Sequence, residues 1–422
     1  MAVGSVLLEL TGIIQEKSAE VDKFIRERGL PQPSFDHSYP PILKLSPEAD
    51  AARQAALEAI DELRCHLLGP LGMIMSHTSE MSHLVSIHGL PHFKIPAALP
   101  PDGSAISISD LATETGMHID DTRTLVRHGS ARYLIKSLPG DQVSHSAASK
   151  AMLSMPVLTG LIECGLLMTK STHHIADVME RFPGTQDMSR TAYSLAYNTP
   201  LSFFEHLATQ PERAQHFAAA MGLLASSPAL SADFVFEYDW TPHAHGTMVD
   251  VGGSRGHIAF TLAERFPHMH FVVQDRPEIV GSAPDEDRHR SERVKFQEHD
   301  FFTPQPVVGA SVYFLRFILH DWPTEYCLRI LRALIPALRK GSRVVIMDGI
   351  VPEPGVLGKL DERRITGYDV LMKALFNAKE RSEDEWRTLF DEADTERRFE
   401  IVQVLQPKGS QLGFIVAAWQ GD

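Results

Sequence analysis

The sequence predicts an α/β protein whose C-terminal part holds a doubly wound, mostly parallel sheet and whose N-terminal part is helical. Three observations lead to this class. From Gly246 onward, short apolar segments alternate with helical segments, which is typical of a parallel sheet covered by helices on both faces. A glycine-rich turn joins the first of these strands to a helix, where open α/β sheets bind nucleotide-like ligands. Residues 106–150 carry a separate pattern of two helices followed by two short strands.

Composition places the chain among globular proteins and excludes several classes of function. The 422 residues suffice for two or three domains; 43% are hydrophobic and 22% are charged. A net charge of -14 argues against a surface that neutralises nucleic-acid phosphates. No apolar run approaches the roughly 20 residues of a membrane span. The three cysteines are far apart without a CxxC motif, which argues against a disulfide framework. We therefore expect a reduced, cytoplasmic protein that binds no nucleic acid and no membrane.

Two histidine pairs, His173-His174 and His243-x-His245, invite interpretation as metal ligands. The sequence places no third ligand near either pair, and a metal site needs one. We interpret these side chains as surface histidines and expect no metal site.

Helical signals dominate the N-terminal part of the chain. A helical arm followed by a Pro-rich linker is expected over residues 1–45. Ser46 and Pro47 are the cap and first turn of the next helix, which carries an apolar stripe. We expect Gly69-Pro70 to stop that helix.

The pattern of residues 106–150 is that of a winged helix. Ser109 is predicted to cap its first helix, Gly116 to form the turn, and Asp120 to lie near the start of the second helix. Such a module binds DNA through its second helix or serves as a structural or dimerisation module. Acidic residues at the start of that helix and the net charge of -14 favour the second role.

The C-terminal domain, expected over residues 241–422, is predicted to contain seven main strands. The last two are joined by the turn QPKGSQ, which is too short for a crossover helix, so we expect them to pair antiparallel. The strand segments, in order, are TMVDV, HFVVQD, RVKFQ, SVYFLRFIL, SRVVIMD, FEIVQVL and LGFIVAAW.

The glycine-rich turn VDVGGSRG indicates a ligand that carries positive charge and no pyrophosphate. Counted from Gly252, the dinucleotide pattern GxGxxG would need glycine at Ser254 and His257. Asp250, two residues before the turn, would repel a pyrophosphate but suits the amino and sulfonium groups of S-adenosylmethionine. Asp275 ends the second strand about 20 residues further on, where a carboxylate can accept hydrogen bonds from both ribose hydroxyls. The alternative for the turn alone is an ordinary tight turn.

Two further strands supply residues for the same ligand. Asp300 can accept from an adenine amino group while Phe301 packs on the purine; the alternative is a capping carboxylate beside a core ring. Arg316 and His320 are four residues apart in one predicted strand, so we expect both side chains on the same face. Arg316 needs a partner inside an apolar strand, either the ligand or an internal salt bridge.

Three polar residues at or just after predicted strand ends are candidates for acid–base chemistry: His320, Asp348 and Glu380. A histidine with a pKa of about 6.5 can accept a proton at neutral pH, and a carboxylate behind its other nitrogen fixes the tautomer. Methyl transfer from a sulfonium needs little more than such a base and in-line placement of the reacting atoms. The alternative for a lone histidine at a strand end is a surface or capping residue.

With these motifs, the chain resembles the S-adenosylmethionine-dependent O-methyltransferases of plant phenolic and fungal polyketide metabolism. The resemblance covers residues from about 55 to 420. It rests on the segments AYNTPLSFFEHLATQPERAQHFAAAM, VDVGGSRG, QDRPEI, EHDFF, LRFILHDWPTEYCLRIL, VVIMDGIVPE and AKERSEDEW. It implies S-adenosyl-L-methionine as cofactor, a homodimer, a Rossmann-like seven-stranded methyltransferase domain and an N-terminal all-α/winged-helix dimerisation domain. The implied division is an arm and linker (1–45), the dimerisation domain (46–185), connecting helices that line the substrate pocket (186–240) and the methyltransferase domain (241–422).

The resemblance also implies roles for single residues. His320 matches the general base, and Asp348 and Glu380 match the carboxylates that orient it. The cofactor-binding positions are Gly252 and Gly253 at the methionine end, Asp275 at the ribose, Asp300 and Phe301 at the adenine, and Arg316, where many members have lysine.

Two departures from the family pattern leave the reaction open. Ser254 replaces the third glycine of the usual GGGxG turn, and Asn377-Ala378 replaces Gly-Gly before Lys-Glu-Arg. The leading interpretation is methyl transfer to a hydroxyl of an aromatic or polyketide secondary metabolite.

The alternative is a pericyclase or dehydratase of fungal pyridone-type biosynthesis, since some fungal proteins resembling this family use the same pocket in that way. In such an enzyme, His128, Arg316 and Asp321 would be hydrogen-bonding groups toward the substrate. A DNA-binding regulator is a third class, which the acidic charge opposes. Apolar candidates for the substrate pocket are Met168, Met372 and Phe376.

Overall fold

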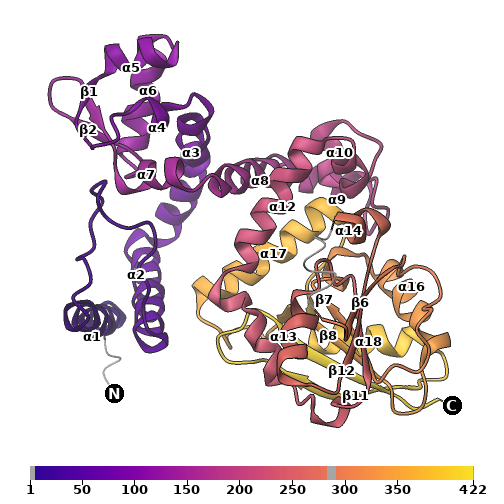
Figure 1. Cartoon of the computed structure of the whole chain (residues 1–422). Helices are drawn as coiled ribbons and strands as arrows, with labels where there is room; N and C mark the ends of the chain where they lie inside the picture. The colour runs from indigo at the N-terminus through magenta and orange to yellow at the C-terminus, as the bar shows by residue number, and fades with distance from the viewer. Residues whose placement is uncertain (1–4, 283–290, 422) are drawn as a thin grey trace. The chain divides into compact units, whose positions relative to one another are not determined.

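The computed structural model describes residues 5–282 and 291–421 of the chain (Figure 1). The described chain divides into two compact units. The first holds the residues up to Leu167 with Glu212–Ala220 and Gly358–Leu360, and the second holds the rest.

The first unit consists of helices around a small sheet. Strands β1, β3 and β2 lie in that order and pair antiparallel. Leu111, Val126 and Val143 are fully buried in its core. Two helices followed by two strands is the element order that the sequence predicts for residues 106–150. The elements are α1 (Val6–Glu27), α2 (Pro47–Ser79), α3 (His83–His92), α4 (Ile95–Ala98), β1 (Ile106–Ser107), α5 (Ile108–Thr115), α6 (Ile119–Ser130), β2 (Lys136–Leu138), β3 (Gln142–Ser144) and α7 (Ala147–Ser154).

Two predicted helix boundaries in this unit are wrong. Helix α2 begins as predicted, with the Ser46 side chain accepting from the Ala49 N–H, but it continues past Gly69 to Ser79. Gly69 has φ 63° and ψ 176°, which kinks the helix, and the following proline suits the first turn of the resumed helix. Helix α5 is capped by Ser107 instead of Ser109, because the extended residue just before the helix is the one whose side chain can reach the Asp110 N–H.

The second unit is built on a seven-stranded mixed sheet in the order β11-β12-β8-β7-β4-β5-β6. The four pairs from β8 to β6 are parallel, while β12 pairs antiparallel with both β8 and β11, as the short connection predicts. This is the predicted Rossmann-like α/β fold. The strands are β4 (Thr247–Val251), β5 (His270–Asp275), β6 (Val294–Glu298), β7 (Val312–Arg316), β8 (Arg343–Asp348), β11 (Phe399–Leu405) and β12 (Gly413–Trp419), with a short parallel pair β9 (Ile350–Val351) and β10 (Arg381–Ser382).

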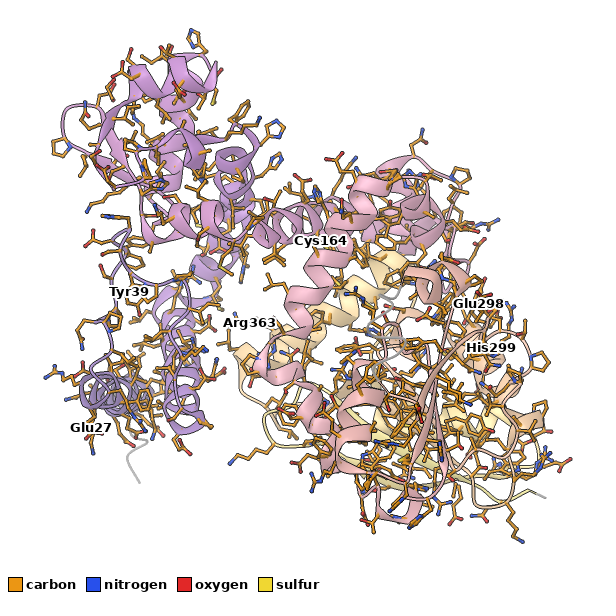
Figure 2. All side chains as sticks on the ribbon, in the orientation of Figure 1. Glu27, Tyr39, Cys164, Glu298, His299 and Arg363 are labelled. Carbon is orange, nitrogen blue, oxygen red and sulfur yellow. The ribbon has the colours of Figure 1, made fainter. Side chains whose placement is uncertain are left out.

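Helices cover both faces of this sheet (Figure 1). Val249 and Val251 of β4 pack in one layer with α16 and α18, while Met248 packs in the other with α13. Figure 2 shows the side chains that fill both layers. The helices of this unit are α9 (Ile175–Arg181), α10 (Ala192–Tyr197), α11 (Phe203–Ala208), α13 (His257–Arg265), α14 (Pro277–Ser282), α16 (Thr324–Leu334) and α18 (Glu383–Ala393), and three further helices, α8 (Val157–Thr172), α12 (Pro211–Ala225) and α17 (Lys359–Phe376), have residues in both units.

The sheet has a topological switch point beside β4. The chain runs from β4 outward to β5 and β6, then returns to the other side of β4 to form β7 and β8. Ligands of open α/β sheets bind at the carboxyl ends of the strands at such a point. A ligand site is therefore expected in the loops after β4, β5, β7 and β8.

Strand β7 is shorter than predicted. It ends at Arg316; Phe317 takes the left-handed conformation with φ 55°, and Leu319–Asp321 form a 3₁₀ turn. Arg316 and His320 therefore do not share one strand, and the predicted same-face relation between them is wrong. The prediction failed because the apolar run continues beyond the last residue that pairs with β8.

All three cysteines are free, and Cys164 of α8 (Figure 2) and Cys327 of α16 are buried. In the part of the chain that the structure describes, no single helix has the length and apolar character of a membrane span. The bent pair Ala147–Ser154 and Val157–Arg181, with 104° between its halves, meets that test by length and composition alone.

Candidate active site

His320 lies in the 3₁₀ turn after β7, between two carboxylates. Its Nδ1 is 3.0 Å from Glu380 Oε1, and its Nε2 is 3.5 Å from Asp321 Oδ1. The His320 side chain is 15% exposed and that of Glu380 is 8% exposed. With its Nδ1–H donated to Glu380, the imidazole has Nε2 left as the nitrogen that can exchange a proton with a ligand.

Asp348, at the end of β8, supports the same turn in a different way. Its Oδ2 accepts from the backbone N–H of Leu319 at 3.0 Å. Among the described residues it makes no hydrogen bond to the imidazole, and its Oδ1 has no partner. The resemblance implied that Asp348 and Glu380 both orient His320; in the structure Glu380 contacts the ring and Asp348 holds the backbone beside it.

The carboxylates control the charge of the site. Burial alone would lower the pKa of His320, but Asp321, Glu380 and Asp348 outweigh it and raise the pKa to about 10. Burial raises the pKa of Asp348 to about 7, although the His320 cation opposes this shift. These acidic neighbours therefore favour the protonated form of His320 at neutral pH. A second cation placed beside it favours loss of the imidazole proton.

The glycine-rich turn lies at the carboxyl ends of β4 and β5. The N–H groups of Gly252 and Gly253 donate to the carbonyl of Gln274 at 2.8 and 3.0 Å. Asp275 Oδ2 accepts from the Ser254 N–H at 2.9 Å, so the residue predicted at the ribose also anchors the turn. A Cβ on Gly252 would lie 2.5 Å from Ile318 Cδ1, so the missing side chain preserves space between this turn and the loop after β7.

Phe301 and Asp300 follow β6 on the same edge. A Cβ on Gly252 would lie 3.9 Å from Phe301 Cε1, so the structure brings Phe301 next to the glycine turn. The ring also packs edge-on to Trp322, with centroids 5.7 Å apart. Asp300 is exposed, and its Oδ1 accepts from the Phe302 N–H at 3.0 Å. That contact closes a turn and caps no helix, since no helix begins here among the described residues, and it leaves the other oxygen of Asp300 for a ligand.

Asp250 is buried and Arg316 is half-buried beside the switch point, and the two side chains do not form an ion pair with each other. Arg316 Nη2 donates to the carbonyl of Leu230 at 2.8 Å, while its Nε has no hydrogen-bond partner in the described part of the chain. Burial raises the pKa of Asp250 to about 7 in spite of the Arg316 charge, and none of the described residues donates to its Oδ2. The predicted partner of the Arg316 guanidinium was a ligand or an internal salt bridge. In the structure a backbone carbonyl instead accepts one of its hydrogen bonds.

These residues fit S-adenosyl-L-methionine. Nearly all buried polar atoms in proteins have hydrogen-bond partners, so a group of buried atoms without partners indicates a polar ligand. Acidic groups predominate in this group, which suits a cationic ligand, and the glycine turn supplies room beside Phe301. The atoms are Asp250 Oδ2, Arg316 Nε, Asp348 Oδ1 and Glu380 Oε2.

Aromatic side chains extend from the turn that carries His320 to the end of α17. Phe376 stacks on Phe204 with centroids 5.2 Å apart, and Phe204 in turn faces Trp322 at 6.5 Å. Met372 and Phe376 are buried on α17, and Met168 on α8 is half-buried. Met168, Met372 and Phe376 all belong to the unit that holds His320, and their contact with a substrate stays a prediction.

His128 belongs to the other unit. Its Nδ1 is 2.5 Å from Ser86 Oγ, and its Nε2 lies 3.3 Å from both Ser82 Oγ and Arg132 Nε. These contacts place it in the packing of α6 against α3, and a contact of His128 with the substrate stays a prediction.

The histidine pairs give no metal site within the described ranges, where no group of three His, Cys, Asp or Glu side chains is placed to hold an ion. His243, predicted at the surface, is buried. Its Nε2 lies 2.9 Å from Tyr238 Oη, and burial lowers the pKa of His243 to about 4. His243 was predicted at the surface because no pattern in the sequence around this proline turn indicates that its side chain is buried.

Ser254 is a point of backbone strain in the turn. It has φ 51°, in the left-handed region where the family pattern has glycine. Replacing Ser254 by glycine removes this strain but adds conformational entropy to the unfolded chain. The net effect is expected to stabilise the protein by about 0.5–1 kcal/mol. Calorimetry should show a rise in Tm of about 1–3 °C. Gly256→Ala is the opposing control, because Gly256 has φ 72° and its Cβ would lie 3.0 Å from Val273. A lower Tm for Ser254→Gly would contradict the assignment of strain.

Comparisons with known proteins give a consistent result. Residues 173–395 match the O-methyltransferase domain family. The "Grayanic acid biosynthesis cluster O-methyltransferase" of Cladonia grayi is 34% identical over 423 residues, which cover 99% of this chain and 89% of that protein. The "O-methyltransferase PaMT" of Phomopsis amygdali is 35% identical over 420 residues, covering 97% and 96%.

Solved structures share the fold. The crystal structure of OxaC has a TM-score of 0.76 at 22% identity and covers 99% of this chain and 100% of that one. The structure of LepI in complex with SAM has a TM-score of 0.68 at 23% identity and covers 96% and 100%.

Proposed function

The chain belongs to the O-methyltransferase family, and from this premise we propose that it methylates a hydroxyl of an aromatic or polyketide metabolite, with His320 as general base. As a member of that family it is an S-adenosylmethionine-dependent methyltransferase of fungal secondary metabolism. The observation that carries the finer proposal is the 3.0 Å contact between His320 Nδ1 and Glu380 Oε1, on the sheet edge that also holds the glycine turn.

Bound S-adenosyl-L-methionine supplies a methyl group made electrophilic by the sulfonium charge. In our proposal, Asp275 and the turn at Gly252 hold its ribose and methionine parts, and Phe301 packs against the adenine. His320 Nε2 accepts the proton of the acceptor hydroxyl as the oxygen attacks. Glu380 then stabilises the charged imidazole through Nδ1–H. Structures of OxaC with sinefungin and of LepI with SAM support the choice of cofactor by fold.

The proposed acceptor is planar and apolar. The stacked rings of Phe204 and Phe376, the tilted Trp322 ring beside them and the flexible Met372 lie in the unit that holds His320. Aromatic faces at these centroid distances suit a flat ring system, and methionine fills irregular gaps beside one.

Incubation with cofactor labelled in its methyl group, together with a panel of phenolic polyketides, tests the proposal. Label is expected in an O-methyl ether of at least one phenol. Label that appears on carbon or nitrogen, or in no product while the acceptor is consumed, would contradict it.

A pericyclase or dehydratase is the second candidate function. The pKa of His320, raised to about 10 by its three carboxylate neighbours, makes the ring a hydrogen-bond donor at neutral pH when no second cation is bound. A donor suits a reaction that moves no methyl group. "A Pericyclic Reaction enzyme" shares the fold with a TM-score of 0.69 at 22% identity.

The charge of His320 predicts the pH dependence of the reaction. Neutral imidazole is the active form of a base, and the carboxylates keep the proton on the ring, so kcat/KM is expected to rise with pH above neutrality. Glu380→Gln removes one carboxylate that raises the pKa of His320. The rising limb should therefore move to lower pH, although the maximum rate falls.

A profile of kcat/KM from about pH 6 to about pH 10 measures this limb. Glu383→Gln is the control, since Glu383 pairs with Arg387 on the exposed face of α18. A limb that stays in place or moves upward in Glu380→Gln would be evidence against His320 as the titrating group.

We also propose that the protein is a homodimer, that its winged-helix module serves this dimer, and that it acts in the cytoplasm. The second half of α2 carries four apolar residues that are each more than 60% exposed in the first unit: Leu67, Leu71, Ile74 and Met75. A contiguous apolar surface of this kind marks a protein interface.

Leu71→Glu together with Ile74→Glu is expected to convert the dimer to a monomer, because two charges would be buried at the interface. Sedimentation velocity measures the change. Val356→Glu, at a lone exposed valine, should leave the dimer intact. A wild-type protein that sediments as a monomer would refute the proposed dimer.

A further inference from the structure

We propose that Arg381 is a positioning residue for the catalytic histidine: its guanidinium fixes the backbone of the turn that carries His320. The inference rests on the proposed function of His320 and adds to that site a residue that touches neither cofactor nor acceptor. Sequence reasoning missed it, although an arginine directly after the orienting carboxylate in AKERSEDEW was the available signal.

Arg381 donates hydrogen bonds to backbone carbonyls at both ends of the turn that carries His320. Its Nη1 donates to the carbonyl of Leu319 at 3.0 Å, and its Nη2 donates to the carbonyl of Trp322 at 3.1 Å. These two residues enclose His320 and Asp321 in the chain. One guanidinium group therefore connects the two ends of the segment that holds His320.

The same segment is held by two further side chains. Cys327 Sγ lies 3.2 Å from the carbonyl oxygens of both Leu319 and Trp322, so its single S–H can donate to either. Asp348 Oδ2 accepts from the Leu319 N–H at 3.0 Å. Both polar groups of the Leu319 backbone are thus satisfied by side chains from other elements, because the turn lies beyond the end of the β7 ladder.

Glu380 and Arg381, adjacent in the chain, act on the same turn: Glu380 contacts the His320 ring, and Arg381 contacts the backbone at Leu319 and Trp322. Arg381 pairs with Ile350 in the short parallel pair β9–β10. Successive side chains of extended backbone point to opposite sides, so Glu380 reaches the imidazole while Arg381 reaches the backbone below it. Any shift of this strand would move the carboxylate and the turn together. The distance between Glu380 and His320 is preserved in this way.

The guanidinium of Arg381 can hold two backbone carbonyls from a buried position. Arg381 is 1% exposed and, within the described residues, forms no ion pair with a carboxylate. A buried cation is costly unless its N–H groups are satisfied, and here carbonyls, the Cys327 sulfur and the face of Trp386 at 5.2 Å surround it. Its planar fork reaches two carbonyls at once, which a lysine ammonium cannot do with the same geometry.

Arg381→Lys in the full-length enzyme tests the inference. The charge remains, but one of the two carbonyls loses its donor, so the base is displaced. We expect kcat to fall by about 10²-fold, as for a misplacement of about 1 Å, with cofactor Kd within about threefold of wild type. The double variant with His320→Ala should be no slower than His320→Ala alone, because both changes act on one group.

Arg293→Lys is the matched control. Arg293 also donates to backbone carbonyls, those of Ala263, Phe266 and Met269, but it lies at the amino ends of β5 and β6. Its substitution should leave kcat within about threefold of wild type. Cys327→Ala, which removes the weaker donor to the same carbonyls, is a milder second variant and should lower kcat by several-fold.

The titration of His320, followed by NMR of protein labelled at the histidine ring carbons, separates this inference from the proposed function. Arg381→Lys should shift the titration midpoint of His320, and Arg293→Lys should not. Unchanged kcat in Arg381→Lys, or a loss that adds in full to that of His320→Ala, would overturn the positioning role. If His320→Ala itself retained methyl transfer, the base would be refuted, and the NMR shift would still decide whether Arg381 positions the ring.

Discussion

Replacing His320 by alanine is expected to lower kcat for methyl transfer by about 10²- to 10⁴-fold, the range that general-base catalysis contributes. In the proposed mechanism the acceptor hydroxyl loses its proton to His320 Nε2, while Glu380 holds the imidazole through Nδ1. Cofactor Kd should stay within about threefold of wild type, because the proposal places the imidazole against the acceptor and not against the cofactor. Steady-state kinetics and calorimetric titration of the cofactor measure the two quantities.

His268→Ala is the control for this substitution. His268 is exposed and stacks on His245, with ring centroids 5.2 Å apart, before β5 at the amino edge of the sheet. Its loss should change kcat by less than about twofold. A His320→Ala enzyme that keeps more than a tenth of the wild-type kcat with a weakly acidic phenol would contradict the assignment of the base.

Replacing Asp275 by alanine is expected to raise the Kd of the cofactor by about 10²-fold. Two hydrogen bonds from ribose hydroxyls to a carboxylate are worth about 1.5–3 kcal/mol each, and part of that is recovered by water. Asp275 also anchors the turn through the Ser254 N–H, so the alanine variant loosens the turn as well. Asp275→Asn retains an acceptor oxygen and should raise Kd by about tenfold.

Asp239→Ala provides the comparison for Asp275. Asp239 is an exposed carboxylate in the same unit that accepts from the Thr241 N–H at 3.0 Å. Like Asp275 it accepts a backbone hydrogen bond, but it does not lie at the glycine-rich turn. Its substitution should leave cofactor Kd unchanged. Equal affinities of Asp275→Ala and wild type would place the ribose elsewhere.

The positions of the site residues along the chain could be predicted because strand ends of a parallel sheet meet at one edge. Asp250, Asp275 and Asp348 each lie at or near the end of an apolar segment, and the structure places all three on that edge. The alternation of strands and helices also predicted the parallel sheet, and the short QPKGSQ turn predicted its antiparallel pair.

The local geometry of the site could not be predicted in the same way. The apolar run of β7 continues through Phe317 and Ile318, so periodicity extended the strand beyond Arg316. The turn forms because Asp348 and Arg381, far away in sequence, bind the backbone at Leu319. For the same reason, sequence order could not decide which carboxylate contacts the imidazole.

The amount of S-adenosylhomocysteine released per acceptor molecule consumed tests methyl transfer most directly. Quantitative chromatography of one reaction with the wild-type enzyme and an active phenolic substrate gives this ratio. A ratio of one is predicted, since each hydroxyl that loses its proton to His320 takes one methyl group. A ratio near zero, with acceptor converted to an isomer or a dehydrated product while the cofactor stays intact, would contradict methyl transfer and establish the alternative reaction.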